Sequence, residues 1–312
     1  GQASPYNHFI KPSPDQMLRA TVGLALKRAR LANVYSALRG KDAATGVDNP
    51  DKREGQFTLM REAQAAVLNL ANWHHFLDAL KLAGYRGQKM VSSEAAIIFS
   101  YVLYLIGIRD YGIDRTRMRQ AIAEFYFMAS MTGRYTSSPE TRFEADLGQV
   151  RDLASGEVFV AKLREICDTT LTNDYWEITL PSQLATSAAR SPTLFAYQAS
   201  LIMLDAPALF SPLKLAAMVD PAIKGSKASL EQHHLFPRAY LEAQGVTDLK
   251  LINQIANFAP VEWPDNIKIG KQPPAEYVPA IDSQMTAAER ERVYGLHALP
   301  HLWWELPYDQ FL

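Results

Sequence analysis

"LEQHHLFPRAYL", residues 230–241, places two adjacent histidines before a Phe-Pro step, in a chain of 312 residues that contains seven histidines. An imidazole has a reference pKa of about 6.5, so it can accept a proton or bind a metal ion near neutral pH. Paired histidines also occur on ordinary helices, as we expect of His74 and His75, which lie inside an amphipathic stripe. His233 and His234 therefore indicate a catalytic or metal-binding site only if partner residues occur elsewhere in the chain.

Two asparagines are candidates for those partners. Asn257 lies 23 residues after His234, and Asn266 lies nine residues after Asn257. Asn257 begins "NFAPVEW", a short run that is typical of a strand. Asn266 lies in "WPDNIKIGK", where Pro264 and Asp265 are typical of the first turn of a helix. The pattern predicts one asparagine beside a strand and the other on a helix.

These residue types suit the hydrolysis of a phosphodiester bond. That reaction needs a base that activates water, a cation that offsets charge on the leaving oxygen, and rigid placement of both. A neutral imidazole can serve as the base, a step that typically contributes ~10²–10⁴ in rate. A second imidazole and a distant amide oxygen can hold one divalent ion between a strand and a helix.

The order His-His-x-x-Pro, Asn, and Asn nine residues later resembles the HNH motif of the His-Me finger nucleases, in which a β-hairpin and one helix surround a metal ion. The resemblance implies that His233 is the first metal ligand, His234 the general base and Asn266 the second metal ligand. It also implies that Asn257 fixes the loop that carries the histidines. Asn253 competes for that last role, but only Asn257 stands nine residues before Asn266.

The sequence departs from that motif at two positions. The first ligand is often Asp in this family, whereas His233 is a softer, neutral ligand that favours Mn²⁺ or other transition metals over Mg²⁺. The last ligand is often His, whereas Asn266 offers a weak neutral oxygen. We therefore expect one divalent cofactor, Mg²⁺ or Mn²⁺ with other transition metals as alternatives, bound with modest affinity.

A second resemblance extends over most of the chain. Four stretches are similar to the C-terminal half of GmrSD-type restriction proteins, which implies a DNA-cleaving effector in the bacterial cytoplasm that defends against foreign or modified DNA. Those proteins usually begin with a ParB-like nucleotide-hydrolysing domain marked by Asp-Gly-Gln-Gln-Arg, a sequence that is not found here. The resemblance implies that this chain is the effector half, cut away from such a domain. The start "GQASPYN" lacks a methionine, which is typical of a trimmed or tagged piece of a longer protein. The stretches are residues 133–140, 170–192, 231–241 and 253–277.

The composition is that of an ordinary globular chain, with 48% hydrophobic and 21% charged residues. The net charge of −1 gives no global attraction to nucleic acid, so a DNA-binding surface must be local. The most apolar run, Ala95 to Ile108, is shorter than the ~20 residues needed to cross a bilayer and predicts a buried helix. The single Cys167 cannot form an internal disulfide and is expected in the core, which favours a reducing cytosol.

Hydrophobic periodicity predicts a mainly α-helical fold. The HNH resemblance implies that this fold carries a small ββα-metal module. We expect a helical domain over residues 1–225, the HNH-like module over 226–278, and a C-terminal helical tail over 279–312 that packs on the rest. One amphipathic helix is predicted from the apolar stripe over residues 57–77, with Gly84 as its C-cap. Ser138 is expected to be the N-cap of another helix. Residues 39–55 are expected to form a loop. Further helices are predicted near 14–38, 91–109, 115–131, 157–171 and 193–204.

Five basic residues are candidates for contact with DNA. Lys268 and Lys271 follow the predicted helix start and Arg238 follows the histidines, although an ordinary solvated charge is an equal alternative for each. Arg134 and Arg190 lie near Ser and Pro turns, where capping of helix ends and fixing of loops is the favoured alternative.

Two functions are consistent with these patterns. The intact His-Asn-Asn order favours a metal-dependent DNA endonuclease or nickase. The neutral ligands His233 and Asn266 are also consistent with a catalytically inert scaffold of the same fold that binds DNA or a protein partner.

Overall fold

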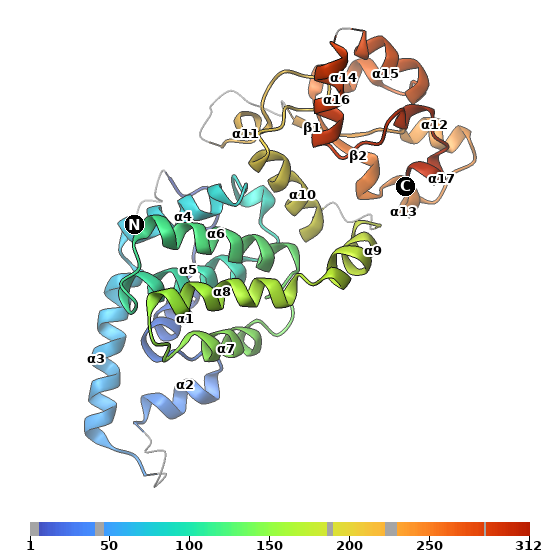
Figure 1. Cartoon of the computed structure of the whole chain (residues 1–312). Helices are drawn as coiled ribbons and strands as arrows, with labels where there is room; N and C mark the ends of the chain where they lie inside the picture. The colour runs from blue at the N-terminus through green and yellow to red at the C-terminus, as the bar shows by residue number, and fades with distance from the viewer. Residues whose placement is uncertain (1–5, 41–46, 186–189, 222–229, 284) are drawn as a thin grey trace. The chain divides into compact units, whose positions relative to one another are not determined.

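The computed structural model describes residues 6–40, 47–185, 190–221, 230–283 and 285–312, which are mainly helical with one small sheet (Figure 1). The chain forms two compact units. The first contains residues 1–83 and 91–172, and the second contains residues 84–90 and 173–312. The division therefore falls earlier in the chain than the predicted boundary between residues 225 and 226. Position 226 itself lies outside the described residues.

The first unit is built around a buried central helix. The predicted apolar run forms this helix, α5 (Glu94–Arg109), which is buried from Ala96 to Gly107 and packs against the first and sixth helices. No described helix is both long and apolar enough to cross a membrane. The other helices are α1 (Pro14–Leu26), α2 (Leu31–Leu38), α3 (Pro50–Val67), α4 (Leu70–Leu82), α6 (Arg115–Met131), α7 (Pro139–Val150) and α8 (Gly156–Thr170).

Several predicted helix boundaries are wrong. The stripe over residues 57–77 is divided between α3 and α4, because the Asn69 side chain accepts hydrogen bonds from the backbone N–H groups at the start of α4. Residues 14–38 likewise form α1 and α2, and residues 50–55 of the predicted loop belong to α3. Ser138 does lie at the N-cap of α7 as predicted, with Pro139 as the first helical residue, but its side chain makes no capping hydrogen bond. Gly84 does follow α4 in the left-handed conformation that favours glycine, with φ 85°.

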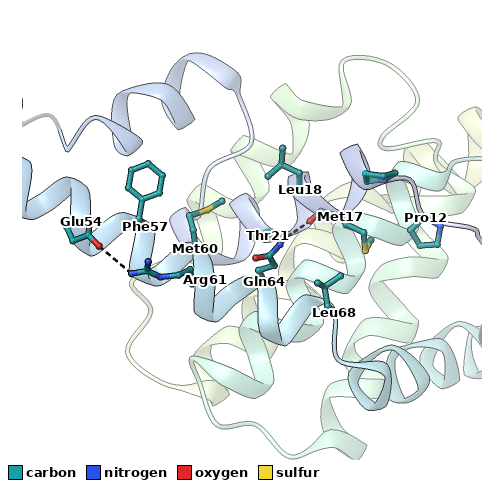
Figure 2. Close-up of a pocket in the computed structure, with 11 residues that line it drawn as sticks. Pro12, Met17, Leu18, Thr21, Glu54, Phe57, Met60, Arg61, Gln64 and Leu68 are labelled. Carbon is teal, nitrogen blue, oxygen red and sulfur yellow. Dashed lines mark hydrogen bonds and ion pairs between the residues drawn. The ribbon is translucent and has the colours of Figure 1, made fainter. Parts of the chain in front are cut away.

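A cavity of about 640 Å³ lies between α1 and α3 (Figure 2). Its lining is mostly apolar and includes Met17 and Leu18 from α1 and Met60 from α3. An exposed ion pair, Glu54 with Arg61 at 3.4 Å, borders it. None of the predicted catalytic or metal-binding residues lines this cavity.

The second unit combines short helices with a two-stranded antiparallel sheet. Its apolar core includes Phe236 and the C-terminal aromatic residues Trp303, Tyr308 and Phe311, so the tail packs on this unit. The strands are β1 (Leu230–His234) and β2 (Phe258–Glu262), and the helices are α9 (Leu180–Leu184), α10 (Pro192–Met203), α11 (Leu215–Met218), α12 (Arg238–Ala243), α13 (Leu249–Ile252), α14 (Trp263–Ile269), α15 (Pro274–Asp282), α16 (Ala287–Leu296) and α17 (Tyr308–Phe311).

One carboxylate fastens the α1–α2 turn of the first unit. Glu144 on α7 accepts hydrogen bonds from the backbone N–H groups of Ala29 and Arg30 and from the side chains of Arg28 and Asn33. Partial burial alone would raise the pKa of Glu144, but these four donors lower it to about 2. Glu144 thus supplies acceptors to the otherwise unsatisfied N–H groups at the start of α2.

We predict that Glu144→Gln destabilises the first unit in a pH-dependent way. The pKa of Glu144 is lower in the folded protein than the ordinary value of 4.5. Its contribution, on the order of 3 kcal/mol, is therefore complete above about pH 4.5 and is lost as the pH falls toward 2. Urea unfolding of both proteins between pH 3 and 7 measures this. Glu157→Gln, at an exposed carboxylate, is the control, and an equal effect of the two substitutions at pH 7 would contradict the prediction.

Candidate active site

Two antiparallel strands and the helix after them carry the predicted site. In the β1–β2 pair, His233 lies opposite Ala259 and His234 lies opposite Phe258. Helix α14 begins directly after β2, with Pro264 in its first turn as predicted. Figure 1 shows β1, β2 and α14 in one cluster, and both strands contact the helix. Successive side chains on a strand point to opposite faces, so the two histidines have different surroundings.

The structure brings the two predicted metal ligands into contact. His233 Nδ1 lies 2.7 Å from Asn266 Oδ1. The His233 residue is 4% exposed, and burial lowers its pKa to about 4, although the contact with Asn266 opposes that shift. Its Nε2 is buried and has no hydrogen-bond partner among the described residues. At neutral pH, His233 is therefore uncharged and keeps one nitrogen lone pair.

The predicted general base has a different partner. His234 Nε2 lies 2.9 Å from Asn253 Oδ1, and the ring of Phe258 lies 4.4 Å from the imidazole, centroid to centroid. An amide oxygen only accepts hydrogen bonds, so Nε2 carries the proton and Nδ1 keeps a lone pair. Nδ1 makes no hydrogen bond within the described part of the chain. Burial lowers the pKa of His234, the Asn253 contact opposes this, and the nearby charge of Arg238 lowers the pKa further.

Asn257 holds the segment that carries the histidines. Its side chain is fully buried and makes three hydrogen bonds. Oδ1 accepts from the Phe236 N–H at 2.7 Å, while Nδ2 donates to the carbonyl oxygens of Phe236 at 3.1 Å and Ile252 at 2.9 Å. Its own carbonyl oxygen accepts from the Leu235 N–H at 2.8 Å. This geometry agrees with the loop-fixing role that the resemblance implies for Asn257.

Asn253 is the site residue whose contact the sequence does not reveal. In the sequence it competes with Asn257 for one role, whereas in the structure the two side chains do different things. Asn257 binds backbone groups, and Asn253 binds the ring of His234. The only signal in the sequence is a polar residue directly after the short apolar helix α13, a place that many unrelated helix ends share.

Four of the five predicted DNA-contacting residues are exposed in the second unit, namely Arg190, Arg238, Lys268 and Lys271. Arg238 begins α12 close enough to His234 for its charge to lower the pKa of that histidine. Lys268 lies on α14 and Lys271 follows that helix. Arg238 and Lys268 also approach acidic residues of their own helices. Such exposed pairs are weak, so they leave these cations able to contact a phosphate.

Arg134 and Arg190 have surroundings that differ from each other. Arg134 belongs to the first unit, where its 4% exposed side chain forms a two-point ion pair with Asp146, at 2.6 and 2.9 Å, and donates to Thr170 Oγ1 at 3.1 Å. Contact with a phosphate would break a buried ion pair, which is costly. The loop-fixing alternative therefore describes Arg134 better than the predicted DNA contact. Arg190 is exposed.

Other residues with reactive side chains have structural surroundings. Burial raises the pKa of Cys167 to about 12, which is the behaviour of the core thiol that the sequence predicts. His74 and His75 lie within α4. His297 is buried, and its Nε2 lies 2.9 Å from the Pro207 carbonyl oxygen.

The donor atoms of His233 and Asn266 fit a divalent cation. Neighbouring ligands of an octahedral ion, each at ~2.1 Å, lie about 3 Å apart, close to the 2.7 Å between His233 Nδ1 and Asn266 Oδ1. In the structure Nδ1 faces an amide oxygen, which only accepts hydrogen bonds, so Nδ1 carries the ring proton and Nε2 the lone pair. Coordination of a cation through Nδ1 would therefore require that proton to move to Nε2. No group of three or more His, Cys, Asp or Glu side chains that could hold a metal ion occurs among the described residues. Water or phosphate oxygens would have to complete the shell, and the imidazole suits Mn²⁺ or other transition metals better than Mg²⁺.

Comparison with protein families, with curated proteins and with solved structures finds no match to this chain. The HNH and GmrSD-type resemblances therefore stay predictions from the sequence.

We predict that Asn257→Ala strongly destabilises the second unit. The substitution leaves the buried N–H and carbonyl of Phe236 without a side-chain partner, and each unsatisfied group costs about 1–3 kcal/mol. The Ile252 carbonyl keeps only a 3.4 Å contact with the Tyr308 hydroxyl. Urea unfolding should show a loss of at least about 3 kcal/mol. Gln272→Ala removes one exposed amide that bonds to the Lys268 carbonyl, and it should cost less than about 1 kcal/mol. Similar losses for the two variants would contradict the anchoring role of Asn257.

Proposed function

We propose that this chain is a metal-dependent DNA endonuclease or nickase that acts in bacterial defence against foreign or modified DNA. The observation that carries the proposal is the contact between His233 and Asn266 beside a neutral His234 whose Nδ1 is open. His233 and His234 lie on β1, Asn257 directly precedes β2, and Asn266 lies on α14, which is the order of the HNH motif. The wider assignment, to a cytoplasmic effector that works with a ParB-like nucleotide-hydrolysing domain, is supported by the GmrSD-type resemblance.

In the proposed reaction, His234 is the general base. Nδ1 accepts a proton from a water molecule, while Nε2–H stays bonded to Asn253 Oδ1. The water oxygen forms a bond to phosphorus, and the bond between phosphorus and the 3′-oxygen breaks. Lowering of the pKa of His234 by burial keeps the imidazole neutral at pH 7, so it is ready to take up the proton.

The other predicted site residues would bind the cation or the DNA and would not take part in proton transfer. His233 Nδ1 and Asn266 Oδ1 would hold the divalent cation, which when bound supplies positive charge to stabilise the departing oxygen. The exposed side chains of Arg238, Lys268 and Lys271 would bind neighbouring phosphates.

A catalytically inert scaffold that binds DNA or a protein partner is the second candidate. It is favoured by the neutral donors at His233 and Asn266, which have no carboxylate to strengthen their hold on a cation. Incubation of supercoiled plasmid with Mg²⁺, Mn²⁺ or EDTA separates the two functions. Metal-dependent conversion to open circle supports the enzyme, and DNA binding without nicking under every metal supports the scaffold.

We predict that His234→Ala abolishes plasmid nicking while the protein remains folded. Loss of the general base should lower the rate of cleavage about 10²–10⁴-fold. The fold should persist because the half-buried ring contributes little to the apolar core. Open-circle formation with Mn²⁺ is the measurement, and circular dichroism checks the fold. His301→Ala, at an exposed histidine of the tail, should nick as the wild type does. Nicking by His234→Ala at the wild-type rate would show that another group is the base.

We predict that Asn266→Asp lowers the metal concentration needed for nicking. A carboxylate at this position adds a negative charge to a pair of neutral donors, and ligand charge strongly affects the affinity for hard cations. The half-saturating Mg²⁺ concentration should fall about tenfold, which is ~1.4 kcal/mol of binding free energy. Asp265→Asn on the same helix is the control and should leave this concentration within about twofold. A value for Asn266→Asp equal to that of the wild type would place the cation elsewhere.

A further inference from the structure

The contact between Asn253 and His234 joins the proposed base to a side chain that the HNH motif does not include. We propose that Asn253 is a positioning residue that fixes the orientation and the tautomer of the His234 ring. The inference rests on the proposed function only in naming His234 the base. The contact itself and its effect on the ring can be measured without any assay of activity.

The chemistry of the two partners makes the contact directional. A neutral imidazole has one N–H donor and one acceptor nitrogen, and the partner of one nitrogen selects the state of the other. Asn253 Oδ1 can only accept, so it selects the tautomer in which Nε2 carries the proton. The Phe258 ring covers the imidazole at 4.4 Å and limits its rotation. Together these contacts direct the Nδ1 lone pair away from Asn253.

Asn253 is itself held from two directions. It follows α13, whose last carbonyl, that of Ile252, accepts from Asn257 Nδ2 at 2.9 Å. The Tyr308 hydroxyl donates to the Leu251 carbonyl at 2.8 Å. Helix α17, which carries Tyr308, lies beside α13 (Figure 1). The C-terminal helix and the buried amide of Asn257 thus fix the backbone from which Asn253 reaches the ring.

A purely structural amide would affect the stability of the fold but not the proton on the ring. Asn253 is only partly buried, so water could satisfy its amide if the His234 contact were absent. Leu and Asp have nearly the same shape as Asn, and they differ in whether they present an acceptor. Asn253→Leu therefore removes the acceptor without a large cavity, and Asn253→Asp keeps it.

The first test is nuclear magnetic resonance of protein labelled with ¹⁵N at its seven histidines. In the metal-free wild type at pH 8, the ¹⁵N shifts of His234 should show the proton on Nε2. In Asn253→Leu, the ratio of the two tautomers should fall by up to about tenfold, the equivalent of one hydrogen bond of ~1.4 kcal/mol. Asn253→Asp should keep the wild-type ratio, as should Gln254→Ala at the neighbouring position. A proton on Nδ1 in the wild type, or an unchanged ratio in Asn253→Leu, overturns the proposal.

The second test is nicking of supercoiled plasmid with Mn²⁺. Asn253→Leu should lower kcat by about 10- to 100-fold, with KM for the plasmid and the half-saturating metal concentration unchanged, because no phosphate or metal contact is altered. Tyr308→Phe should lower kcat in the same direction by a smaller factor. Unchanged kcat in Asn253→Leu overturns the positioning role. If the wild type nicks under no metal, the proposed function fails, and the tautomer ratio alone decides the role of Asn253.

Discussion

The buried amide of Asn257 is the contact on which the candidate site depends. A two-stranded sheet is marginally stable by itself, and the strands β1 and β2 are joined by a long connection that contains α12 and α13. Asn257 closes that connection by bonding to Phe236 just after β1 and to Ile252 at the end of α13. Without this side chain, the segment after β1 would keep the strand pairing and the bond from the Tyr277 hydroxyl to the Leu235 carbonyl. It would lose the buried hydrogen bonds that fix Phe236 relative to Ile252.

Burial then acts on both histidines in the same direction. The pKa of His233 and the pKa of His234 are both lowered, chiefly because burial disfavours the charged imidazolium. The alternation of side chains along β1 sends the two rings to opposite surroundings, where each meets the amide oxygen of a different asparagine. Burial thus keeps both imidazoles neutral. A neutral His233 could donate a lone pair to a cation, and a neutral His234 could accept a proton.

Much of this arrangement could be predicted from local patterns, and the remainder depends on tertiary contacts. Apolar periodicity and length identified the buried α5, and the settings of Asn257 and Asn266 identified β2 and α14. The break at Asn69 was missed because the apolar stripe continues past it, while a local capping bond decides where α4 begins. Arg134 is buried because Asp146, on α7, is placed opposite it, which no local pattern shows. The contact of Asn253 likewise depends on where α13 ends relative to β1.

The neutrality of His233 and Asn266, the proposed metal ligands, affects how a chain with a net charge of −1 could act on DNA. Two neutral donors hold a cation weakly, whereas phosphate oxygens supply the negative charge that His233 and Asn266 lack. In the proposed nuclease, cation and DNA would therefore each raise the affinity for the other, since such coupling is reciprocal. Attraction to DNA would arise at the site itself, with Arg238 and the lysines of the α14 end adding only local charge. In the proposed nuclease a strongly basic surface would then be unnecessary.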